Sequence, residues 1–339
     1  MNFASDNASG VHPDIMAAML AANGGHLPSY GGDPLTERAE DRLRELFQAP
    51  DARVVLIGTG TGANGLALGQ LCPPYGRIFC HESAHIETSE AGAPGFFTGG
   101  AQLALIAGAA GRITPEGLRA RLADYPQGDA HDGLNAVLSL TNATEWGGVY
   151  TPAQVAALTA IAREAGLRVH MDGARLANAL AATGASPADM TWRAGVDAVC
   201  LGGTKNGCMA LEALIFFNPD HAQGLDFRRM RAGHLWSKHR FLAAQALAWL
   251  NDDLWLRLAG HANAMAARLA KAGELVVPVE ANEVFLRLPR LRIRALRAKG
   301  LRAADWPAPG DNAEYGTIRL VTSWATTEDE VTALLDALA

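Results

Sequence analysis

The stretch Val54-Val-Leu-Ile-Gly-Thr-Gly-Thr-Gly-Ala-Asn-Gly65 joins a short apolar run to a glycine-rich loop. Residues 54–57 predict a buried strand, and the apolar residues 66–71 behind the loop predict a helix. Glycines let the backbone approach an anion closely, and the start of a helix offers unpaired N–H groups and the positive end of the helix dipole. We therefore predict a strand–loop–helix unit of an α/β domain, with a phosphate site in its loop.

Similar strand-sized apolar runs recur along the chain between longer helical patterns. Residues 34–47 repeat leucine and alanine at helical spacing, and Thr151-Pro152 supplies an N-cap and a first-turn proline for a helix over residues 153–165. Strands that alternate with helices predict an α/β domain with a mainly parallel seven-stranded sheet, covered on both faces. The further strands are predicted over residues 77–80, 102–106, 136–140, 167–171, 196–201 and 213–217.

From residue 241 onward the pattern becomes rich in alanine and leucine, and a second group of elements follows. No linker rich in Gly, Ser or Pro precedes it, so we expect a helix to connect the two parts. We predict a large domain over residues 1–240 and a smaller C-terminal α+β domain over residues 241–339. Helices are predicted over residues 241–258, 262–272 and 292–299 and from Thr327, strands over residues 275–280, 283–288 and 317–322, and a loop over residues 306–311.

The formal net charge is −6, and the sequence contains no basic run. We therefore expect neither nucleic acid nor a membrane as the main partner, and favour a small-molecule enzyme. The chain opens with MNFASDNASG, without the basic and apolar regions of a signal peptide, and no stretch of 18 uncharged apolar residues occurs. The four cysteines form no C-x-x-C pair, so we expect reduced thiols and a cytoplasmic protein.

The glycine-rich loop also satisfies the dinucleotide-binding fingerprint, as Gly60-x-Gly62-x-x-Gly65. Glu82 follows the next predicted strand, near where an acid would hold a ribose. An NAD-dependent oxidoreductase is therefore the alternative from another enzyme class. Against it, about fifty residues with their own helices precede the strand, whereas a dinucleotide-binding domain commonly begins with that strand.

The segment His81-Glu-Ser-Ala-His85 matches the motif H-E-x-x-H, whose histidines bind zinc when a helix presents both on one face. Here the motif directly follows a predicted strand, and residues 87–94 are a poor helix interior. We therefore expect no metal site. A single histidine at the carboxyl edge of a sheet is better suited to covering a ligand or carrying a proton.

Two neighbouring strand ends carry unusual polar residues. Asp172 follows one apolar strand, with Arg175 close behind, and Lys205 lies in a glycine-flanked turn after the next strand. The turn is no Walker motif, because Thr204 precedes the lysine. Burial lowers the pKa of a lysine and frees a nucleophilic amine, so Lys205 is a candidate for imine formation, although a lone lysine would be interpreted as a surface residue.

In chain order, the sequence thus offers a phosphate loop, the imidazole of His85, the carboxylate of Asp172 and the amine of Lys205. These are the parts that hold pyridoxal 5'-phosphate (PLP): an anion site, a cover for the ring, a partner for the pyridine nitrogen and a Schiff-base amine. The combination predicts a PLP-dependent enzyme.

With these residues, the chain resembles the threonine aldolase family, which has the aspartate-aminotransferase-like fold (PLP fold type I), and most of all its low-specificity L-threonine aldolases. The resemblance covers nearly the whole chain, and its order makes it more specific than any single motif. The matching segments are residues 3–7, 30–34, 59–61 with 63–64, 84–86, 170–176, 203–207, 231–233 with 237–238, and 318–322.

The resemblance implies a role for each matching position. Lys205 would carry the cofactor, Asp172 would pair with the pyridine nitrogen, and His85 would stack on the ring, so these three are the implied catalytic residues. Gly60 and Thr61 would hold the phosphate. The full set implied to contact the cofactor is Gly60, Thr61, His85, Asp172, Arg175, Thr204 and Lys205.

The substrate carboxylate is implied to bind Ser5, Arg175 and Arg319, and the forked guanidinium group suits that task. Tyr30 and residues 231–238 match positions that reach into the site of a neighbouring subunit. The resemblance therefore implies a homo-oligomer, typically a tetramer built as a dimer of dimers, with sites shared between subunits and Tyr30 among the substrate contacts.

The implied reaction is a retro-aldol cleavage of L-threonine, L-allo-threonine and related β-hydroxy-α-amino acids to glycine and an aldehyde, which makes the enzyme a lyase. An L-phenylserine aldolase, another PLP-dependent lyase or a cofactor-binding protein without turnover would carry the same cofactor residues. Many relatives have a second active-site histidine in the segment that here reads Asn142-Ala-Thr-Glu145. The sequence therefore leaves open whether His85 or another group accepts the proton of the β-hydroxyl.

Overall fold

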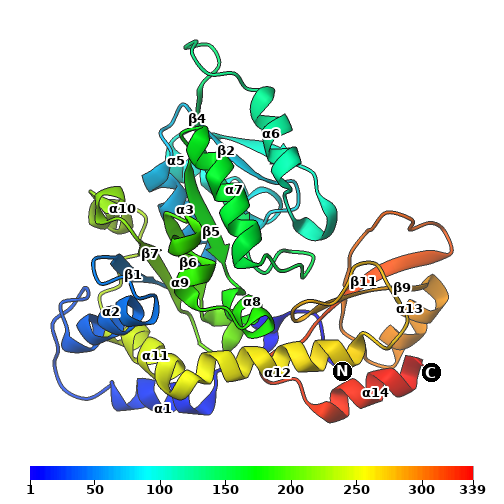
Figure 1. The fold of residues 1–339 in the computed structure, drawn as a ribbon. Coiled ribbons are helices and arrows are strands. Elements are labelled where there is room, and N and C mark those ends of the chain that lie inside the picture. Colours follow the sequence, from blue (N-terminus) through cyan, green and yellow to red (C-terminus); the bar gives the residue numbers. More distant parts are fainter. Residues whose placement is uncertain (339) are drawn as a thin grey trace.

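The computed structural model describes residues 1–338 and is built around a seven-stranded sheet (Figure 1). Its strands are β1 Arg53–Ile57, β2 Gly76–His81, β3 Gln102–Ile106, β4 Leu134–Thr141, β5 Arg168–Gly173, β6 Ala198–Gly202 and β7 Glu212–Phe216. The strand order is β1-β7-β6-β5-β4-β2-β3. Strand β7 runs antiparallel to its neighbours β1 and β6, and all other pairs are parallel. The predicted α/β fold with a mainly parallel seven-stranded sheet is confirmed.

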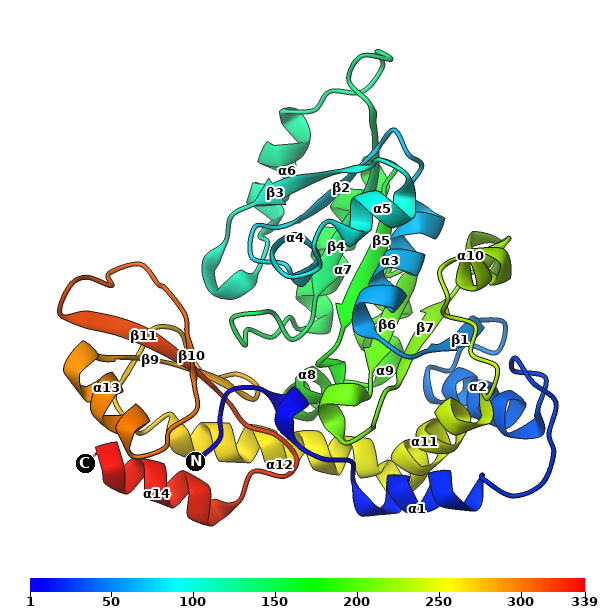
Figure 2. The same cartoon turned by 180° about the vertical axis from the view of Figure 1, so that it is seen from behind.

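Helices cover both faces of this sheet (Figures 1 and 2). Strand residues alternate between two apolar cores, since Val54 and Leu56 face one core and Val55 and Ile57 face the other. The helices of this part are α1 Pro13–Ala21, α2 Pro34–Leu46, α3 Gly60–Leu71, α4 His85–Thr88, α5 Ala93–Thr98, α6 Pro115–Ala123, α7 Pro152–Glu164, α8 Leu176–Thr183, α9 Pro187–Met190, α10 Leu225–Arg231 and α11 Arg240–Leu250. The short 3-10 helices are η1 Asp6–Ala8, η2 Ala109–Gly111, η3 Trp192–Ala194, η4 Thr204–Asn206, η5 Pro219–Ala222 and η6 Asn251–Asp253.

Local capping explains where the predicted helices begin. Thr151 and Gln154 form a capping box at the start of α7, with Pro152 in the first turn. In α2, the carboxylate of Asp33 accepts hydrogen bonds from the N–H groups of Leu35 and Thr36. These side chains satisfy N–H groups that have no partner within the helix, which fixes both helix starts.

A second, smaller sheet has the order β10-β11-β9-β8 and is antiparallel throughout. Its strands are β8 Glu274–Leu275, β9 Glu283–Pro289, β10 Ala304–Asp305 and β11 Tyr315–Val321, and its helices are α12 Leu254–Leu269, α13 Arg290–Ala298 and α14 Glu328–Leu338. A separate apolar core joins this sheet to the end of α12 and to Phe3 near the N-terminus. Helix α12 therefore connects the two sheets, as Figures 1 and 2 show.

Two predicted elements of the C-terminal part were wrong in their bounds. The helical break predicted near residues 259–261 lies instead at η6, where Asp252 and Asp253 take the left-handed conformation that aspartate tolerates better than most residues. The strand predicted over residues 275–280 ends at Leu275. Pro278 explains part of this, because it has no N–H to donate to a neighbouring strand.

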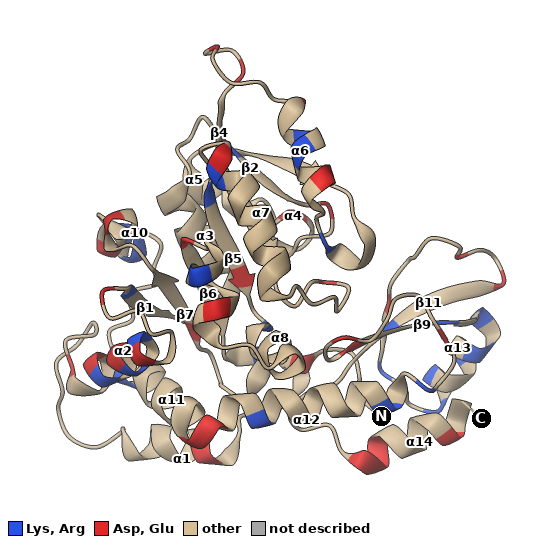
Figure 3. Cartoon of the chain, in the orientation of Figure 1, with Lys and Arg blue, Asp and Glu red and all other residues tan. Residues whose placement is uncertain are grey.

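The division into domains at residue 240/241 stays a prediction. Leu242 and Trp255, which lie beyond that point, pack in the core of the large sheet. Within residues 1–338, no helix combines the length and the apolar character needed to cross a membrane. Charges of both signs are spread over the chain, but α13 carries four arginines in nine residues, a local basic cluster that the whole-chain charge balance did not indicate (Figure 3).

Candidate active site

A cavity lies at the carboxyl ends of the central parallel strands and brings together six of the predicted site residues. Asp172 comes from β5, Lys205 from η4 directly after β6, and Gly60 and Thr61 from the start of α3. His85 begins α4, and Arg175 follows β5. The complete lining is Gly60, Thr61, Asn64, His85, Glu90, Thr141, Ala143, Glu145, Asp172, Ala174, Arg175 and Lys205.

Two glycines let the ends of β5 and β6 approach closely. A Cβ on Gly202 would lie 2.5 Å from the carbonyl oxygen of Ala174, and a Cβ on Gly173 would lie 2.6 Å from that of Cys200. Real side chains do not tolerate such contacts with backbone. The glycines flanking the two strand ends therefore bring Asp172 and Lys205 to the same cavity.

The turn that carries Lys205 is anchored by the two residues that follow the lysine. The Asn206 side chain donates a hydrogen bond to the carbonyl of Trp255 (2.7 Å), and the Trp249 indole donates to the carbonyl of Asn206 (3.0 Å). Gly207 has φ +97° and accepts a hydrogen bond from His12 N–H (2.9 Å). The half-buried Lys205 thus projects from a fixed turn.

Asp172 is a buried carboxylate with two defined hydrogen-bond donors. Its Oδ2 accepts from the side-chain amide of Asn64 (2.8 Å), and its Oδ1 accepts from the N–H of Ala174 (2.9 Å). Burial opposes ionisation, but the positive charge of Lys205 and these donors outweigh it and hold the pKa of Asp172 below its ordinary value. The cavity therefore holds a carboxylate whose ionised form is favoured, together with a lysine.

Asn64 also links Asp172 to the cavity histidine. Its amide nitrogen donates to Glu90 Oε1 (3.0 Å), which lies 2.8 Å from His85 Nδ1. The side chain of Glu90 is fully buried. A buried carboxylate that bonds one ring nitrogen fixes the orientation of an imidazole, so Glu90 orients His85.

Glu145 is a second buried carboxyl group in the cavity. Its Oε1 accepts hydrogen bonds from the N–H of His85 (2.6 Å) and the hydroxyl of Thr141 (3.2 Å). Its Oε2 is buried without a hydrogen-bond partner among the described residues. Burial, with the negative charge of Asp172 in addition, raises the pKa of Glu145 to about 7.

The glycines of the predicted phosphate loop have different surroundings. No described atom lies within 4 Å of a Cβ built on Gly60, whereas a Cβ on Gly62 would meet His234 at 2.3 Å and one on Gly65 would meet Phe97 at 2.5 Å. Gly60 and Thr61 form the first turn of α3, where N–H groups point outward at the positive end of the helix. Of these three glycines, only Gly60 lines the cavity. Gly62 and Gly65 instead let His234 and Phe97 pack closely against α3.

The strand order of the sheet also argues against the dinucleotide-binding alternative. In the dinucleotide-binding fold, the strand before the glycine loop is central, in the order 3-2-1-4-5-6. Here β1 is an edge strand that pairs with the antiparallel β7. The strand–loop–helix unit therefore resembles the dinucleotide-binding fingerprint locally, but it lies at a different place in the sheet.

The two predicted carboxylate-binding arginines share a buried acidic neighbour. Arg175 pairs with Asp6 through two hydrogen bonds, Nε to Oδ2 (2.8 Å) and Nη2 to Oδ1 (3.1 Å). Glu283 Oε1 lies 3.6 Å from Arg175 Nη2 and 3.5 Å from Arg319 Nη1. Arg319 also stacks on Trp306, with 4.5 Å from its guanidinium carbon to the ring centroid. Burial raises the pKa of Glu283, although both arginines oppose that shift.

Four predicted residues lie outside the cavity lining. Ser5 caps η1 by accepting a hydrogen bond from Asn7 N–H (3.1 Å), next to Asp6. Arg319 lies outside the cavity lining and is linked to Arg175 through their shared neighbour Glu283. The hydroxyl of Thr204 accepts from Leu211 N–H (3.0 Å) and donates to the Leu211 carbonyl (3.3 Å), so its cofactor contact stays a prediction. Tyr30 is 52% exposed, at φ +59°.

The H-E-x-x-H motif is divided between two elements. His81 ends β2, and its ring nitrogens lie 2.8 Å from the Ser83 hydroxyl and 3.0 Å from the Gly108 carbonyl. His85 begins α4 and faces Glu90. Since β2 ends between them, the two histidines do not share a helix face, as a zinc motif would require.

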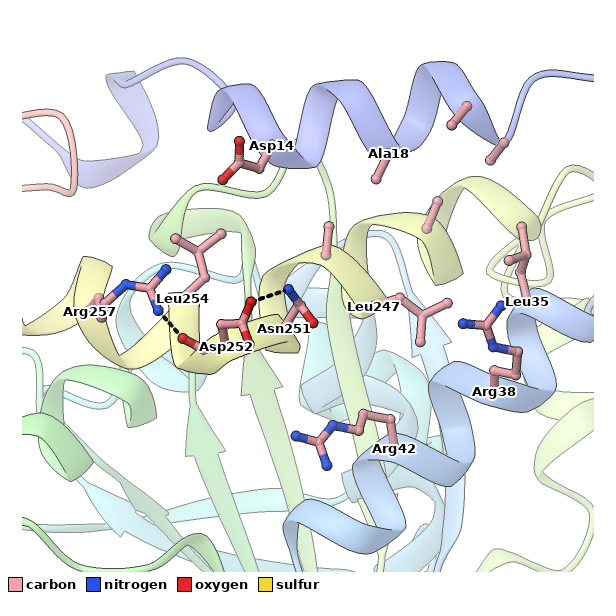
Figure 4. A pocket seen from close by; sticks show the side chains of 14 residues that line it. Asp14, Ala18, Leu35, Arg38, Arg42, Leu247, Asn251, Asp252, Leu254 and Arg257 are labelled. Atoms are coloured by element: carbon pink, nitrogen blue, oxygen red, sulfur yellow. Dashed lines mark hydrogen bonds between the residues drawn. The ribbon is translucent and has the colours of Figure 1, made fainter.

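A larger pocket of about 730 Å³ lies between α1, α2 and α11 and shares no lining residue with the cavity (Figure 4). Arg38, Arg42 and Arg257 line it together with Asp14 and several alanine and leucine side chains (Figure 4). It contains no described lysine or histidine. We therefore assign the candidate active site to the smaller cavity, which contains Lys205 and His85.

Sequence reasoning missed several residues of the site. Asn64, Glu90 and Glu145 line the cavity, and Asp6 and Glu283 neutralise its arginines. The sequence offered a partial signal for Glu283, which opens a predicted apolar strand. Glu90 and Glu145 lie in loop-like segments, where a carboxylate has no pattern to distinguish it from a surface residue.

Comparison with known proteins agrees with this geometry. A low specificity L-threonine aldolase of Pseudomonas aeruginosa is 46% identical over 338 residues, which cover 98% of this chain and 95% of that protein. The solved threonine aldolase of Leishmania major matches with a TM-score of 0.93 at 28% identity, over 99% of this chain and 98% of that one. A serine palmitoyltransferase from S. paucimobilis, solved with PLP and myriocin, matches in fold with a TM-score of 0.71 at 16% identity, over 100% and 86% of the chains.

The family of beta-eliminating lyases matches residues 2–287. This range includes every residue of the cavity lining. The resemblance inferred from the motifs is confirmed, and the chain belongs to the beta-eliminating lyase family and, within it, to the low specificity L-threonine aldolases.

Proposed function

We propose that this chain is a PLP-dependent lyase that cleaves L-threonine, L-allo-threonine and related β-hydroxy-α-amino acids to glycine and an aldehyde. One observation carries the proposal: the amine of Lys205, the buried carboxylate of Asp172 and the start of α3 all line one cavity. The names of the relatives support the choice of substrate class.

The residues of the cavity fit PLP. The open space beside Gly60 and the first-turn N–H groups of α3 suit a phosphate. The ionised Asp172 suits a protonated pyridine nitrogen, and Lys205 has no carboxylate within ion-pair distance among residues 1–338. Bound there, PLP would supply an electron sink for the pair released when the Cα–Cβ bond of the substrate breaks.

Each side chain would then have a distinct task. Lys205 would hold the cofactor through its amine, Gly60 and Thr61 would hold the phosphate, and His85 would cover the ring. Asp172 would keep a proton on the ring nitrogen, because the negative charge of a buried carboxylate favours the protonated pyridine. Thr204 would contribute a further contact near Lys205.

Substrate orientation would select the bond that breaks. Arg175, Arg319 and Ser5 would bind the substrate carboxylate, and the bond that is perpendicular to the cofactor ring is the one that breaks most readily. Asp6 and Glu283 hold the two guanidinium groups in place. The arginine cluster would thereby favour Cα–Cβ cleavage over loss of the α-proton.

We further propose that the chain forms a homotetramer with shared sites and acts in the cytoplasm. Met16 and Leu20 on α1 are 44% and 75% exposed, and large apolar side chains at a surface often mark a contact with another chain. Tyr30 lies in the segment after α1 and does not line the cavity of its own chain. Four buried free cysteines are typical of a reducing compartment.

The test is spectroscopic and enzymatic. The purified protein should absorb in the near-visible range and release an aldehyde from L-threonine, L-allo-threonine or L-phenylserine. Lys205→Ala should lose both properties, whereas Lys271→Ala, at an exposed position, should keep both. A Lys205→Ala protein with the wild-type spectrum and turnover would refute the proposal.

The oligomer has its own measurement. Sedimentation velocity should give a tetramer for the wild-type chain, and Leu20→Asp should shift it toward smaller species. A monomer that retains full turnover would refute the shared site. Preference for L-phenylserine over L-threonine in the aldehyde assay would favour the phenylserine aldolase alternative.

A further inference from the structure

Of the ionisable side chains that line the cavity, three are not among those proposed above to hold the cofactor through an amine, to pair with its ring nitrogen or to bind the substrate carboxylate. They are His85, Glu90 and Glu145. Glu90 Oε1 accepts a hydrogen bond from Asn64 and lies 2.8 Å from His85 Nδ1, so Glu90 and the ring of His85 are already paired with each other. Glu90 and Glu145 each have an oxygen, Oε2, that is buried without a partner among the described residues. Glu90 is paired with the ring of His85, whereas Glu145 is bonded only by a backbone N–H and a hydroxyl and pairs with no ionisable side chain within residues 1–338.

We propose that Glu145 is the catalytic base that accepts the proton of the substrate β-hydroxyl. This inference rests on the proposed function and deepens it. The Glu145 residue is 8% exposed, and its Oε1 is fixed by the N–H of His85 (2.6 Å) and the hydroxyl of Thr141 (3.2 Å). One oxygen is thus held by the protein while the other is left for a ligand.

The loop that carries Glu145 is held rigidly. Asn142 bonds to the backbone of Tyr150 in both directions, at 3.2 Å and 3.1 Å. Thr144 donates to the carbonyl of Ala110 (2.8 Å) and accepts from Gly148 N–H (2.9 Å). A base on a fixed loop keeps its geometry toward the substrate without losing conformational entropy at each turnover.

The electrostatic surroundings make this carboxyl group a stronger base than an exposed glutamate. Burial and the charge of Asp172 raise the pKa of Glu145 to about 7, against the donors at its Oε1. A base whose pKa lies near neutral pH combines a sufficient ionised fraction with a strong pull on the proton. The charged and titratable groups that face it or share its cavity are Asp172, Arg175, Lys205, His85, Glu90, Tyr150 and Cys80.

The proposed step balances without a further reagent. Glu145 takes the proton from the β-hydroxyl, and the O–H electron pair becomes the second bond of the aldehyde C=O. The Cα–Cβ bond breaks and its pair stays with Cα, which later takes up one proton to give glycine. One proton therefore leaves the substrate at oxygen and one enters at Cα, with no change in oxidation state overall.

Glu145→Gln is the direct test, because the amide keeps the shape and still accepts from His85 N–H and Thr141. We expect kcat for L-threonine to fall at least about 100-fold, the lower bound for loss of a general base. The near-visible absorbance of the holoenzyme should not change. Glu116→Gln removes an exposed carboxylate and should behave as the wild type in every assay.

Glycine provides a substrate without a β-hydroxyl. We expect Glu145→Gln holoenzyme to exchange the α-hydrogen of glycine for deuterium, followed by proton NMR in heavy water, at close to the wild-type rate. A merely structural role for Glu145 would slow exchange and cleavage together, and that result would overturn the inference.

Infrared spectroscopy supplies a readout that is independent of turnover. In the full-length chain, carboxyl C=O absorbance should be lost as the pH rises through about 7, and Glu145→Gln should lack this component while it keeps that of Glu212, whose pKa burial raises to about 8. Wild-type kcat in Glu145→Gln, or an unchanged infrared titration, would overturn the assignment. A wild-type chain that neither cleaves L-threonine nor exchanges glycine would refute the proposed function instead.

Discussion

Asp6 and Arg175 form a bidentate ion pair between the N-terminal segment and the end of β5, with Nε–Oδ2 at 2.8 Å and Nη2–Oδ1 at 3.1 Å. The Asp6 side chain is 1% exposed and that of Arg175 is 10% exposed. Burial raises the pKa of Asp6, but Arg175 and Lys205 outweigh burial and hold the pKa below its usual range. The N-terminal segment therefore takes part in the site through a charge.

Asp6→Asn should destabilise the protein, because it leaves the buried guanidinium with less compensating charge. Loss of one partner of a buried pair typically costs about 3–5 kcal/mol, so we expect a free energy of unfolding lower by about 3 kcal/mol in urea titration. The KM for L-threonine should rise, since Arg175 loses its orientation. Asp14→Asn, whose side chain is 74% exposed, is the matched control. Equal unfolding midpoints for Asp6→Asn and the wild type would contradict the prediction.

Asp172→Asn should separate cofactor binding from catalysis. The asparagine still accepts from Ala174 N–H, but its amide meets the amide donor of Asn64, and the negative charge is gone. We expect PLP to remain bound while kcat for L-threonine falls at least about 100-fold, the scale for losing a preorganised electrostatic partner. Absorbance titration and steady-state kinetics measure the two properties, with the exposed Asp189→Asn as the control. Near-native turnover would mean that Asp172 does not control the protonation of the ring.

The strand positions and most cavity residues were predictable from the sequence for one physical reason. A parallel sheet buried on both faces needs continuous apolar strands, and its ligands gather where those strands end. Asp172 and Lys205 follow two such strands, so their convergence could be inferred before any coordinates. The break between α11 and α12 at η6 could not be inferred in this way, because it depends on two aspartates that take the left-handed conformation.

The carboxylates around the site were not predictable in the same way. Glu90 lies in a segment that reads as a loop, and it becomes a cavity residue only because Asn64, 26 residues earlier, folds beside it. Glu145 lies in a segment where the family resemblance led us to expect a histidine, so the sequence analysis considered the segment for that missing histidine and not for the buried carboxyl group of Glu145. Burial of a charge is a tertiary property, and composition or periodicity does not report it.

Gly60 and Gly65 belong to the same sequence motif but should respond oppositely to alanine. A Cβ at position 60 meets no described atom within 4 Å, so Gly60→Ala should keep the stability of the protein and weaken PLP binding. A Cβ at position 65 would lie 2.5 Å from the ring of Phe97. Overpacking of that kind costs about 1–3 kcal/mol, so Gly65→Ala should lower the free energy of unfolding by that amount. Urea denaturation and PLP titration of both variants check the pair, and the prediction fails if the two variants lose stability equally.

Glu212 should make stability depend on pH near neutrality. It begins β7, pairs with Ile57 of β1 and Gly202 of β6, and is 5% exposed. Burial raises the pKa of Glu212 to about 8, against an unfolded value of 4.5, although Thr204 and Lys205 oppose the shift. Between these pH values the unfolded chain holds fewer protons than the folded chain, so stability falls as the pH rises.

Glu212→Gln should remove this dependence, because an amide has no proton to lose. At about 1.4 kcal/mol for each pKa unit, we expect the free energy of unfolding of the variant, relative to the wild type, to increase by about 3–5 kcal/mol from pH 5 to pH 8. Urea titrations of both proteins at the two pH values measure the difference directly. Glu164→Gln, at an exposed surface pair with Arg119, should show no such change. Parallel stability curves for Glu212→Gln and the wild type would show that Glu212 is already ionised in the folded protein, and that Lys205 and Thr204 compensate its burial in full.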